Sequence, residues 1–484
     1  MNIGLVTACL AATLAFGQWE PDVQATNFPG SGKSVTAEPA ASVDSFVYLV
    51  WDDSRDPSMH ETYFKRSTDD GATWQDDVRL TPADAYWSPC ASVAAQGPDV
   101  HVVWHELRHT SANPTNEEVY YIRSTDHGAT WNPEARLTND TSHSWHPRIA
   151  VSGSTIHVAW ADYRTGLWQV WYKRSTDYGA TWQDDVQLSN GTGIIEVPEV
   201  AVADLGVHVV WQDSRHGLNN HEVYYVHSTD GGATWGAETR LTSEPHESYA
   251  PVVAAAGPDV HVVWVDYRDS NSEVYYKHST DHGNAWGPDV DISNSGSNPG
   301  LYTTLPSVAS SGGNVHVVWG DNFDGNGEIY YRLSGDNGSS WGDRLRLTSE
   351  SHESVTPVVL LTGDEVKAVW PDQRAAPNLE LFFKRNPTGN SSAVCEPGRS
   401  WPRDLLRISP NPLRSGFVAV HLPSGAAVFR WLRVFDAAGS LVRSAAGLQA
   451  SPLLLDLRSV PDGVYLVRLD SDGCSATQKL VVQR

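Results

Sequence analysis

Residues 279–286 read Ser-Thr-Asp-His-Gly-Asn-Ala-Trp, one of six copies of Ser-x-Asp-x-Gly followed three residues later by Trp. The copies run from Ser67 to Trp74, Ser124 to Trp131, Ser175 to Trp182, Ser228 to Trp235, Ser279 to Trp286 and Ser334 to Trp341. Successive tryptophans are 57, 51, 53, 51 and 55 residues apart. A unit of that length cannot bury a core alone and must stack on copies of itself. The pattern therefore predicts a repeat fold.

Each repeat carries four short segments rich in β-branched and aromatic residues, separated by Gly, Pro, Asp and Asn. In the fifth repeat they are 250–256, 260–264, 273–277 and 286–292. Such segments are typical of strands, and four antiparallel strands per repeat form a blade of a β-propeller. The Ser-x-Asp-x-Gly motif falls between the third and fourth strands. Its Ser and Asp can bond nearby backbone groups and its Gly tolerates positive φ, which predicts a tight turn.

A second signature, Trp-x-Asp-x-Arg, ends the second strand of the repeats. It occurs at Trp51, Trp160, Trp211, Trp264 and Trp370, with variants at Trp104 and Trp319. The chain has seven such second strands but only six turn motifs. Because the turn motif precedes the fourth strand, the seventh repeat is expected to lack its own fourth strand. Residues 19–26 match the fourth strands 74–81 and 182–189 position for position. The N-terminal segment is therefore expected to close the ring and cover both sheet edges. Seven blades are predicted, with six as the alternative.

The charge of the chain is unevenly distributed. The whole chain has 34 Lys and Arg and 58 Asp and Glu, of which 11 and 6 lie from Arg399 onward. That leaves 23 basic and 52 acidic residues in the body, a balance of −29 against +5 in the tail. An acidic body repels phosphate backbones, so no nucleic-acid partner is expected.

The first 17 residues are apolar and end in small residues, which is typical of a secretory signal peptide. They lack a Lys or Arg, and Cys9 leaves lipoprotein processing open as an alternative. The other cysteines are Cys90, Cys395 and Cys474. Three cysteines make no disulfide framework, although one bridge between Cys395 and Cys474 is possible.

The turn motif resembles the Asp-box, or BNR repeat, of the sialidase-like propellers, over about residues 19–385. In that superfamily the Asp-box is structural and lies opposite the active site. The resemblance assigns this structural role to the motif aspartates, Asp69, Asp126, Asp177, Asp230, Asp281 and Asp336. The superfamily contains enzymes, receptors and carbohydrate-binding proteins, so it implies the fold more strongly than an activity.

Sialidase activity itself is not favoured by the motifs. A closer resemblance to the sialidases themselves would imply six blades, an early Arg-Ile-Pro motif, an arginine triad, a Tyr–Glu nucleophile pair and an Asp acid/base. Here Arg148-Ile149-Ala150 is the nearest approximation, and Glu-Val-Tyr-Tyr recurs in most blades rather than marking one site.

The tail is a separate unit. Ile408-Ser-Pro-Asn-Pro412, Trp431–Phe435, Pro461-Asp-Gly-Val-Tyr465 and the closing residues 478–484 are similar, in order, to the C-terminal sorting domain of type IX secretion substrates. That family forms a small β-sandwich that directs export across the outer membrane of Bacteroidetes-type bacteria. The resemblance implies a secreted or surface-associated protein whose tail is a partner of the secretion machinery.

These observations predict an all-β chain in four parts. Residues 1–17 are the signal peptide, 18–385 a seven-bladed (alternatively six-bladed) Asp-box β-propeller, 386–400 a linker, and 401–484 a small β-sandwich sorting domain.

The recurring arginines are the first candidate ligand-binding residues. The set is Arg55, Arg108, Arg164, Arg215, Arg268 and Arg374. Guanidinium groups bind carboxylates or sulfates bidentately, and these residues lie on the face away from the turn motifs. The structural alternative is that each pairs with the acid two residues earlier, joined by a third recurring acid such as Glu61 or Glu273. Recurrence in almost every blade favours that alternative.

Three places break the repeat. Blade six replaces the Arg with Phe323 and offers Asp321, Asp324 and Glu328 as candidate Ca²⁺ ligands, or else as an acidic surface turn. No other cofactor is expected.

The second and third breaks are aromatic and histidine-rich. Blade three carries Trp168, which either stacks on a sugar ring or packs at the rim. His105 and Glu106 in blade two, with His143 and His146 in the next loop, could act as general acid and base or be ordinary polar residues.

The sequence therefore favours an exported propeller, expected to be monomeric, that binds an extracellular glycan or another surface polymer. One alternative is a glycoside hydrolase of the sialidase type, which needs two carboxylates at a defined separation that the sequence does not identify. The other is a non-catalytic adhesion or scaffold protein.

Overall fold

The computed structural model describes two parts of the chain. In the first these are residues 19–27, 36–53, 55, 60–82, 88–107, 116–217, 220–268, 271–294, 305–374 and 379–389. In the second they are residues 407–409, 413, 417–421, 431–436, 441–446, 453–458, 460–471 and 474–483. The expected signal peptide, Arg108, Cys395 and residues 390–400 of the expected linker lie outside them. Every described element is a β-strand, which confirms the all-β prediction.

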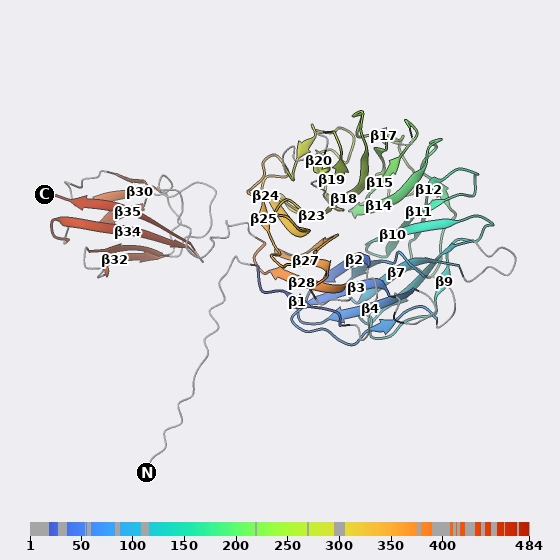
Figure 1. Cartoon of the computed structure of the whole chain (residues 1–484), viewed down its shortest axis with the longest axis horizontal. Helices are drawn as coiled ribbons and strands as arrows, with labels where there is room; N and C mark the ends of the chain where they lie inside the picture. Colours follow the sequence, from blue (N-terminus) through green and yellow to red (C-terminus); the bar gives the residue numbers. More distant parts are fainter. Residues whose placement is uncertain are drawn as a thin grey trace, which may run out of the picture. The chain divides into compact units, whose positions relative to one another are not determined.

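Residues 20–385 form one compact unit of seven four-stranded antiparallel sheets (Figure 1). The first strands of blades 1 to 7 are β2 (Thr36–Val43), β6 (Ser92–Gln96), β10 (Ser144–Ser152), β14 (Ile195–Ala203), β18 (Ser248–Ala256), β22 (Ser307–Ser311) and β26 (Val358–Thr362). The second strands are β3 (Phe46–Asp53), β7 (Asp99–Glu106), β11 (Thr155–Asp162), β15 (Gly206–Asp213), β19 (Asp259–Asp266), β23 (Asn314–Asp321) and β27 (Glu365–Asp372).

The third and fourth strands complete each blade. The third are β4 (Glu61–Ser67), β8 (Glu118–Ser124), β12 (Gln169–Ser175), β16 (Glu222–Ser228), β20 (Glu273–Ser279), β24 (Glu328–Ser334) and β28 (Glu380–Asn386). The fourth are β5 (Val78–Arg79), β9 (Ala135–Arg136), β13 (Val186–Gln187), β17 (Thr239–Arg240), β21 (Val290–Asp291), β25 (Leu345–Arg346) and, in the last blade, β1 (Val23–Gln24).

The ring closes through the N-terminal strand. β1 pairs antiparallel with β28, with Val23 opposite Phe383, and its sheet order is β1-β28-β27-β26. First strands of successive blades contact each other, and β26 contacts β2 (Figure 1). Closure gives the last blade its fourth strand and packs this blade against the first.

The core lies between successive blades. Each second strand carries a fully buried tryptophan, and all seven have an exposed fraction of 0%. One hydrophobic layer joins Val47 and Trp51 of blade 1 to Leu381 and Phe383 of blade 7, with Ala25 of the closing segment beside them. The buried area is therefore shared, and a single blade could not retain it alone.

The tail is a two-sheet sandwich. One sheet has the order β29-β30-β33 and the other β32-β31-β34-β35. The strands are β29 (Arg407–Ser409), β30 (Phe417–His421), β31 (Trp431–Phe435), β32 (Leu441–Ala446), β33 (Leu453–Asp456), β34 (Gly463–Ser471) and β35 (Cys474–Val482). Val418 and Leu455 of the first sheet share a core with Leu432, Val467 and Leu480 of the second. This arrangement confirms the predicted sandwich.

Candidate functional site

The two faces of the ring carry different connections. The Asp-box turn of a blade meets its own first hairpin, as where the His282 N–H donates to the Pro258 carbonyl at 2.8 Å. We call this the turn face. On the opposite face, the segment that leads into the first strand meets the preceding blade in blades 2, 3, 5 and 7, as where the Ser144 N–H donates to the Glu117 carbonyl at 2.9 Å. This second face, the loop face, carries the connections between the second and third strands.

The Asp-box residues hold the turn face together. In all six copies the Ser hydroxyl donates to the Asp carboxylate and accepts the Gly N–H, as in Ser279, Asp281 and Gly283. The Trp of the motif packs edge-on against a ring of the preceding blade, with Trp286 4.9 Å from Tyr225. The motif therefore both forms a turn and packs one blade against the preceding blade.

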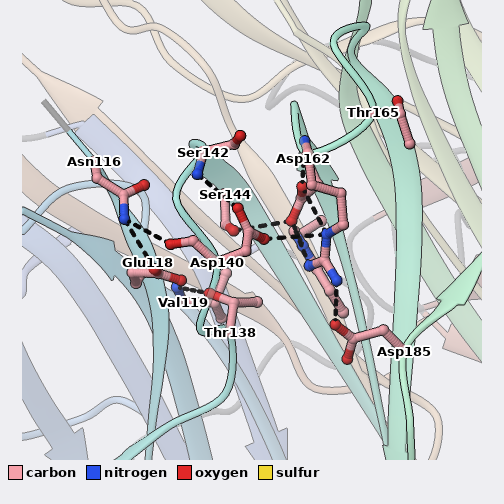
Figure 2. A network of polar contacts seen from close by, with 12 residues as sticks. Asn116, Glu118, Val119, Thr138, Asp140, Ser142, Ser144, Asp162, Thr165 and Asp185 are labelled. Carbon is pink, nitrogen blue, oxygen red and sulfur yellow. Dashed lines mark hydrogen bonds and ion pairs between the residues drawn. The ribbon is translucent and has the colours of Figure 1, made fainter. Parts of the chain in front are cut away.

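The candidate arginines that the structure describes already form ion pairs with acidic side chains of the protein. Arg164 binds Asp162 at 2.6 Å, Asp185 at 2.6 Å and Asp140 at 3.1 Å, as Figure 2 shows for this network. Its guanidinium also lies over the Trp171 ring at 4.2 Å. Burial lowers the pKa of Arg164, but the hydrogen bonds and charges of Asp162 and Asp185 outweigh burial and raise the pKa overall.

The other described arginines repeat this arrangement. Each pairs with the acid two residues earlier and with a second acid immediately before the fourth strand: Arg55 with Asp53 and Asp77, Arg215 with Asp213 and Glu238, Arg268 with Asp266 and Asp289, and Arg374 with Asp372 and Asp22. A ligand carboxylate would have to displace these acids. The contacts therefore support the structural alternative for the arginines over a ligand clamp.

The recurring glutamate that begins six of the seven third strands is also engaged. Glu118 is fully buried and pairs with Arg136, while Asn116 donates to its Oε1 at 3.0 Å (Figure 2). Burial raises the pKa of Glu118. This carboxyl supports the strand ends and does not reach solvent.

In blade 6 the expected calcium ligands Asp321, Asp324 and Glu328 are engaged by donors of the protein. Asp324 accepts a hydrogen bond of 2.5 Å from the Tyr330 hydroxyl, and Glu328 accepts one of 2.5 Å from Arg346. Within the described ranges no three His, Cys, Asp or Glu side chains are arranged to hold a metal ion. These carboxylates therefore serve protein donors, and the calcium prediction finds no donor cluster.

His105 and Glu106 lie inside the blade rather than on its surface. Their exposed fractions are 4% and 0%, and Glu106 accepts the Trp104 indole N–H at 2.8 Å. Burial, with the charges of His146 and Arg148, holds the pKa of His105 well below its usual value. An acid–base pair needs access to substrate, which neither side chain has.

One feature that departs from the repeat on the loop face is an aromatic cluster in blade 3. The rings of Trp145 and Trp168 lie 4.5 Å apart, and Tyr163 lies 5.3 Å from Trp168. His143 contacts Trp145 at 5.3 Å and pairs with Glu117 of blade 2. We call Trp145, Tyr163 and Trp168 the blade-3 platform.

The platform is open to solvent. Tyr163 is 40% exposed and Leu167 beside it is 43% exposed, while both tryptophans are half-buried. Trp145 reaches this position because the first strand bulges between Trp145 and Arg148, with His146 at φ 52°. A bulge re-aims side chains, and here it turns an indole toward the second-to-third-strand loop.

Sequence reasoning identified Trp168 and His143 but missed Trp145 and Tyr163. A signal was available, because Ser-Trp-His-Pro at 144–147 and Asp-Tyr-Arg at 162–164 place aromatic residues where most blades have small or polar ones. The chain contains 20 Trp and 18 Tyr, most of them repeated in the cores, which hides such departures.

Two family profiles match the chain. The profile of the BNR repeat-like domain matches residues 47–246 and 157–367, and that of the secretion system C-terminal sorting domain matches residues 407–483. The residues described include no helix long and apolar enough to cross a membrane.

Individual relatives are glycan-active enzymes that match in part. A xyloglucanase of Paenibacillus sp is 26% identical over 219 residues, which are 41% of this chain and 19% of that protein. A sialidase of Paraclostridium sordellii is 29% identical over 146 residues, which are 23% of this chain and 36% of that protein. The chain thus spans well under half the length of the curated relatives it matches.

Solved structures resemble the chain in fold. The polysaccharide lyase Uly1 aligns with a TM-score of 0.50 and 9% identity, over 73% of this chain and 90% of the lyase. The Hadza microbial sialidase Hz136 aligns with a TM-score of 0.44 and 14% identity, over 69% of this chain and 74% of the sialidase.

Proposed function

The chain belongs to the BNR repeat-like domain family and ends in a secretion sorting domain. We propose that it is an exported propeller that binds glycans. The sorting domain indicates export by type IX secretion to the medium or the cell surface. The ligand is proposed to be an extracellular polysaccharide, bound on the loop face of the ring.

The observation that carries this proposal is the blade-3 platform. Its three rings lie together, half open to solvent, whereas the recurring arginines of the loop face are engaged by acids of the protein. The apolar C–H face of a sugar ring packs on an aromatic face, and the flanking hydroxyls need polar neighbours. His143 and Glu117 at the edge of the platform provide such neighbours. Relatives that are xyloglucanases and sialidases support a glycan as the ligand class.

For the hydrolase alternative, which named no carboxylate pair, the relevant carboxyls are Glu118 and Asp140, whose pKa is raised by burial. A general acid needs such a raised pKa. However, Glu118 is fully buried and Asp140 is paired with Arg164 at 3.1 Å, so neither carboxyl is directed at the platform as a free acid. These contacts favour binding over turnover.

The test of the proposed function is the variant Trp168→Ala on the full chain. Truncating a central aromatic anchor costs about 2 kcal/mol or more, a loss of about 30-fold in affinity. Glycan-array binding should identify the ligands of the wild type, and isothermal titration with the best one should show this loss. Binding that is unaltered in the variant, or absent across the array, contradicts the proposal. Release of reducing sugar from the bound polysaccharide by the wild type would support the hydrolase instead.

A further inference from the structure

A second pair of aromatic residues occupies, in blade 5, the same positions as the blade-3 platform. The residue after the Ser that begins the first strand is Trp145 in blade 3 and Tyr249 in blade 5. The residue after the Asp that ends the second strand is Tyr163 in blade 3 and Tyr267 in blade 5. The remaining blades have no aromatic residue at either position: for the second position they have Ser54, Leu107, Ser214, Asn322 and Gln373.

The two blade-5 rings form a contact of their own. Tyr249 and Tyr267 stack with their centroids 5.8 Å apart and an interplanar angle of 16°, and both are half-buried. The first strand bulges after Tyr249, as it does after Trp145, and Ala250 has a φ of 50°. We call Tyr249 and Tyr267 the blade-5 platform.

Both platforms are fixed by the same polar frame. The Tyr163 N–H donates to the His143 carbonyl at 3.0 Å, and the Tyr267 N–H donates to the Glu247 carbonyl at 3.0 Å. Each of these loop residues then pairs with the preceding blade, His143 with Glu117 and Glu247 with His221 at 3.3 Å. The histidine is on the first-strand side in blade 3 and on the side of the preceding blade in blade 5, so the His–Glu pair between blades is present in both cases with its partners interchanged.

Blade 4, which lies between the platforms, is polar at these positions. It has Glu196 where they have Trp145 and Tyr249, and Ser214 where they have tyrosine. Glu196 is exposed and accepts a hydrogen bond of 3.2 Å from Gln212. Along three successive blades, these loop-face positions are therefore aromatic in blade 3, polar in blade 4 and aromatic again in blade 5.

Building on the proposed function, we propose that the two platforms bind one polysaccharide chain at two separated sugar units, so that the protein recognises an extended polymer and not a terminal sugar. Each ring stack alone is a weak contact. Two contacts on one chain make the second binding event intramolecular, which raises the overall affinity without new contacts. A short oligosaccharide that covers one platform gains nothing from the other.

The experiment uses full-length protein in native gels that contain xyloglucan, arabinan or polysialic acid. The variants are Tyr163→Ser, Tyr267→Ser and the double variant, because blade 4 itself carries Ser214 at this position. Tyr178→Asn is the matched control: Tyr178 is 44% exposed on the turn face, and blade 6 carries Asn337 there. We expect at least one polymer to retard the wild type and the control equally.

On that polymer, each single variant should lose at least fivefold in affinity, and the double variant should bind no better than the wild type binds a disaccharide unit of the same polymer. Wild-type affinity should rise at least tenfold as the oligosaccharide lengthens. If Tyr163→Ser weakens binding and Tyr267→Ser does not, the two-platform inference fails while the proposed function stands. If no polymer retards the wild type, both fail.

Discussion

Gly283 illustrates how one residue holds two blades together. It has a φ of 85°, and a Cβ added to it would overlap the Tyr225 hydroxyl of the preceding blade. The same overlap recurs between Gly179 and Tyr121 and between Gly338 and Tyr276. The glycine of the Asp-box is therefore required twice, for its backbone conformation and for the close approach of a neighbouring ring.

Gly283→Ala should destabilise the propeller by about 3 kcal/mol or more, because strain at positive φ adds to overpacking against Tyr225. Gly257→Ala is the control, since Gly257 has a φ of 60° but no atom within 4 Å of the added Cβ. It should cost only about 1 kcal/mol. Thermal unfolding of both variants measures the difference. Equal losses would mean that the contact with Tyr225 contributes nothing.

At the scale of the strand, the Trp-x-Asp-x-Arg segment combines packing and charge. The Trp fills the core, its N–H donates to the Asp, and the Arg leaves the strand to lie over an aromatic ring, as Arg268 does over Tyr275 at 4.1 Å. In blade 6 the pattern is exchanged: Phe323 replaces the arginine, and Arg344 of the fourth-strand segment lies over Phe323 at 4.0 Å. A cation over a ring is retained although its source changes.

The closing strand should behave as an ordinary fourth strand. The Thr26 hydroxyl donates to buried Glu380 at 2.7 Å and accepts the Leu381 N–H at 2.8 Å. Thr81 makes the equivalent contacts with Glu61 and Thr62 within blade 1. Thr26→Ala and Thr81→Ala should each cost about 1–3 kcal/mol, because both leave a buried carboxylate short of a donor. Chemical denaturation compares them, and a silent Thr26→Ala would exclude a closed ring.

Much of this molecule was predictable because it repeats. Six turn motifs and seven Trp-x-Asp-x-Arg strands specify the blades, and the match of residues 19–26 to other fourth strands predicts the pairing of β1 with β28. The platforms were not predictable to the same degree. Trp145 and Trp168 are 23 residues apart and lie on different strands, and the first-strand bulge that positions Trp145 recurs in blades 1, 4 and 5, so only the aromatic residues placed on this common frame distinguish blade 3.

Across the whole ring, five second strands bury a histidine. These are His101, His157, His208, His261 and His316, and in each the Nδ1 atom bonds a tyrosine hydroxyl of the third strand at 2.6–2.8 Å. Burial lowers the pKa of His261 to about 4 and that of His208 to about 3. Blade 1 uses Tyr48 and Phe64 at these two positions instead.

These histidines make the propeller sensitive to acid. Their pKa in the folded state lies below the unfolded value of about 6.5, so between about pH 6.5 and 4 the unfolded chain binds more protons. Stability should therefore be lost as the pH falls through that window. Each histidine contributes up to about 1.4 kcal/mol per pH unit. The melting temperature measured from pH 7.5 to 4.5 should fall steeply.

The variant His261→Tyr with Tyr276→Phe copies blade 1 and removes one of these groups. Its stability should depend less steeply on pH between 6.5 and 4 than that of the wild type. A slope unchanged by the double substitution would show that His261 does not titrate on unfolding in this window.

The pairing of β1 with β28 also sets an order of events. Val23 and Phe383 are paired, yet some 360 residues of chain must be synthesised between them. At about 5–20 residues per second, this interval lasts roughly 20–70 s. During that time the first-made strand has no partner, and the cores of blades 1 and 7 are uncovered on the side where they will meet. The pairing of β1 with β28 is therefore a single, late step in folding. Any factor that delays synthesis of the last blade leaves the uncovered face of blade 1 exposed to association with other chains.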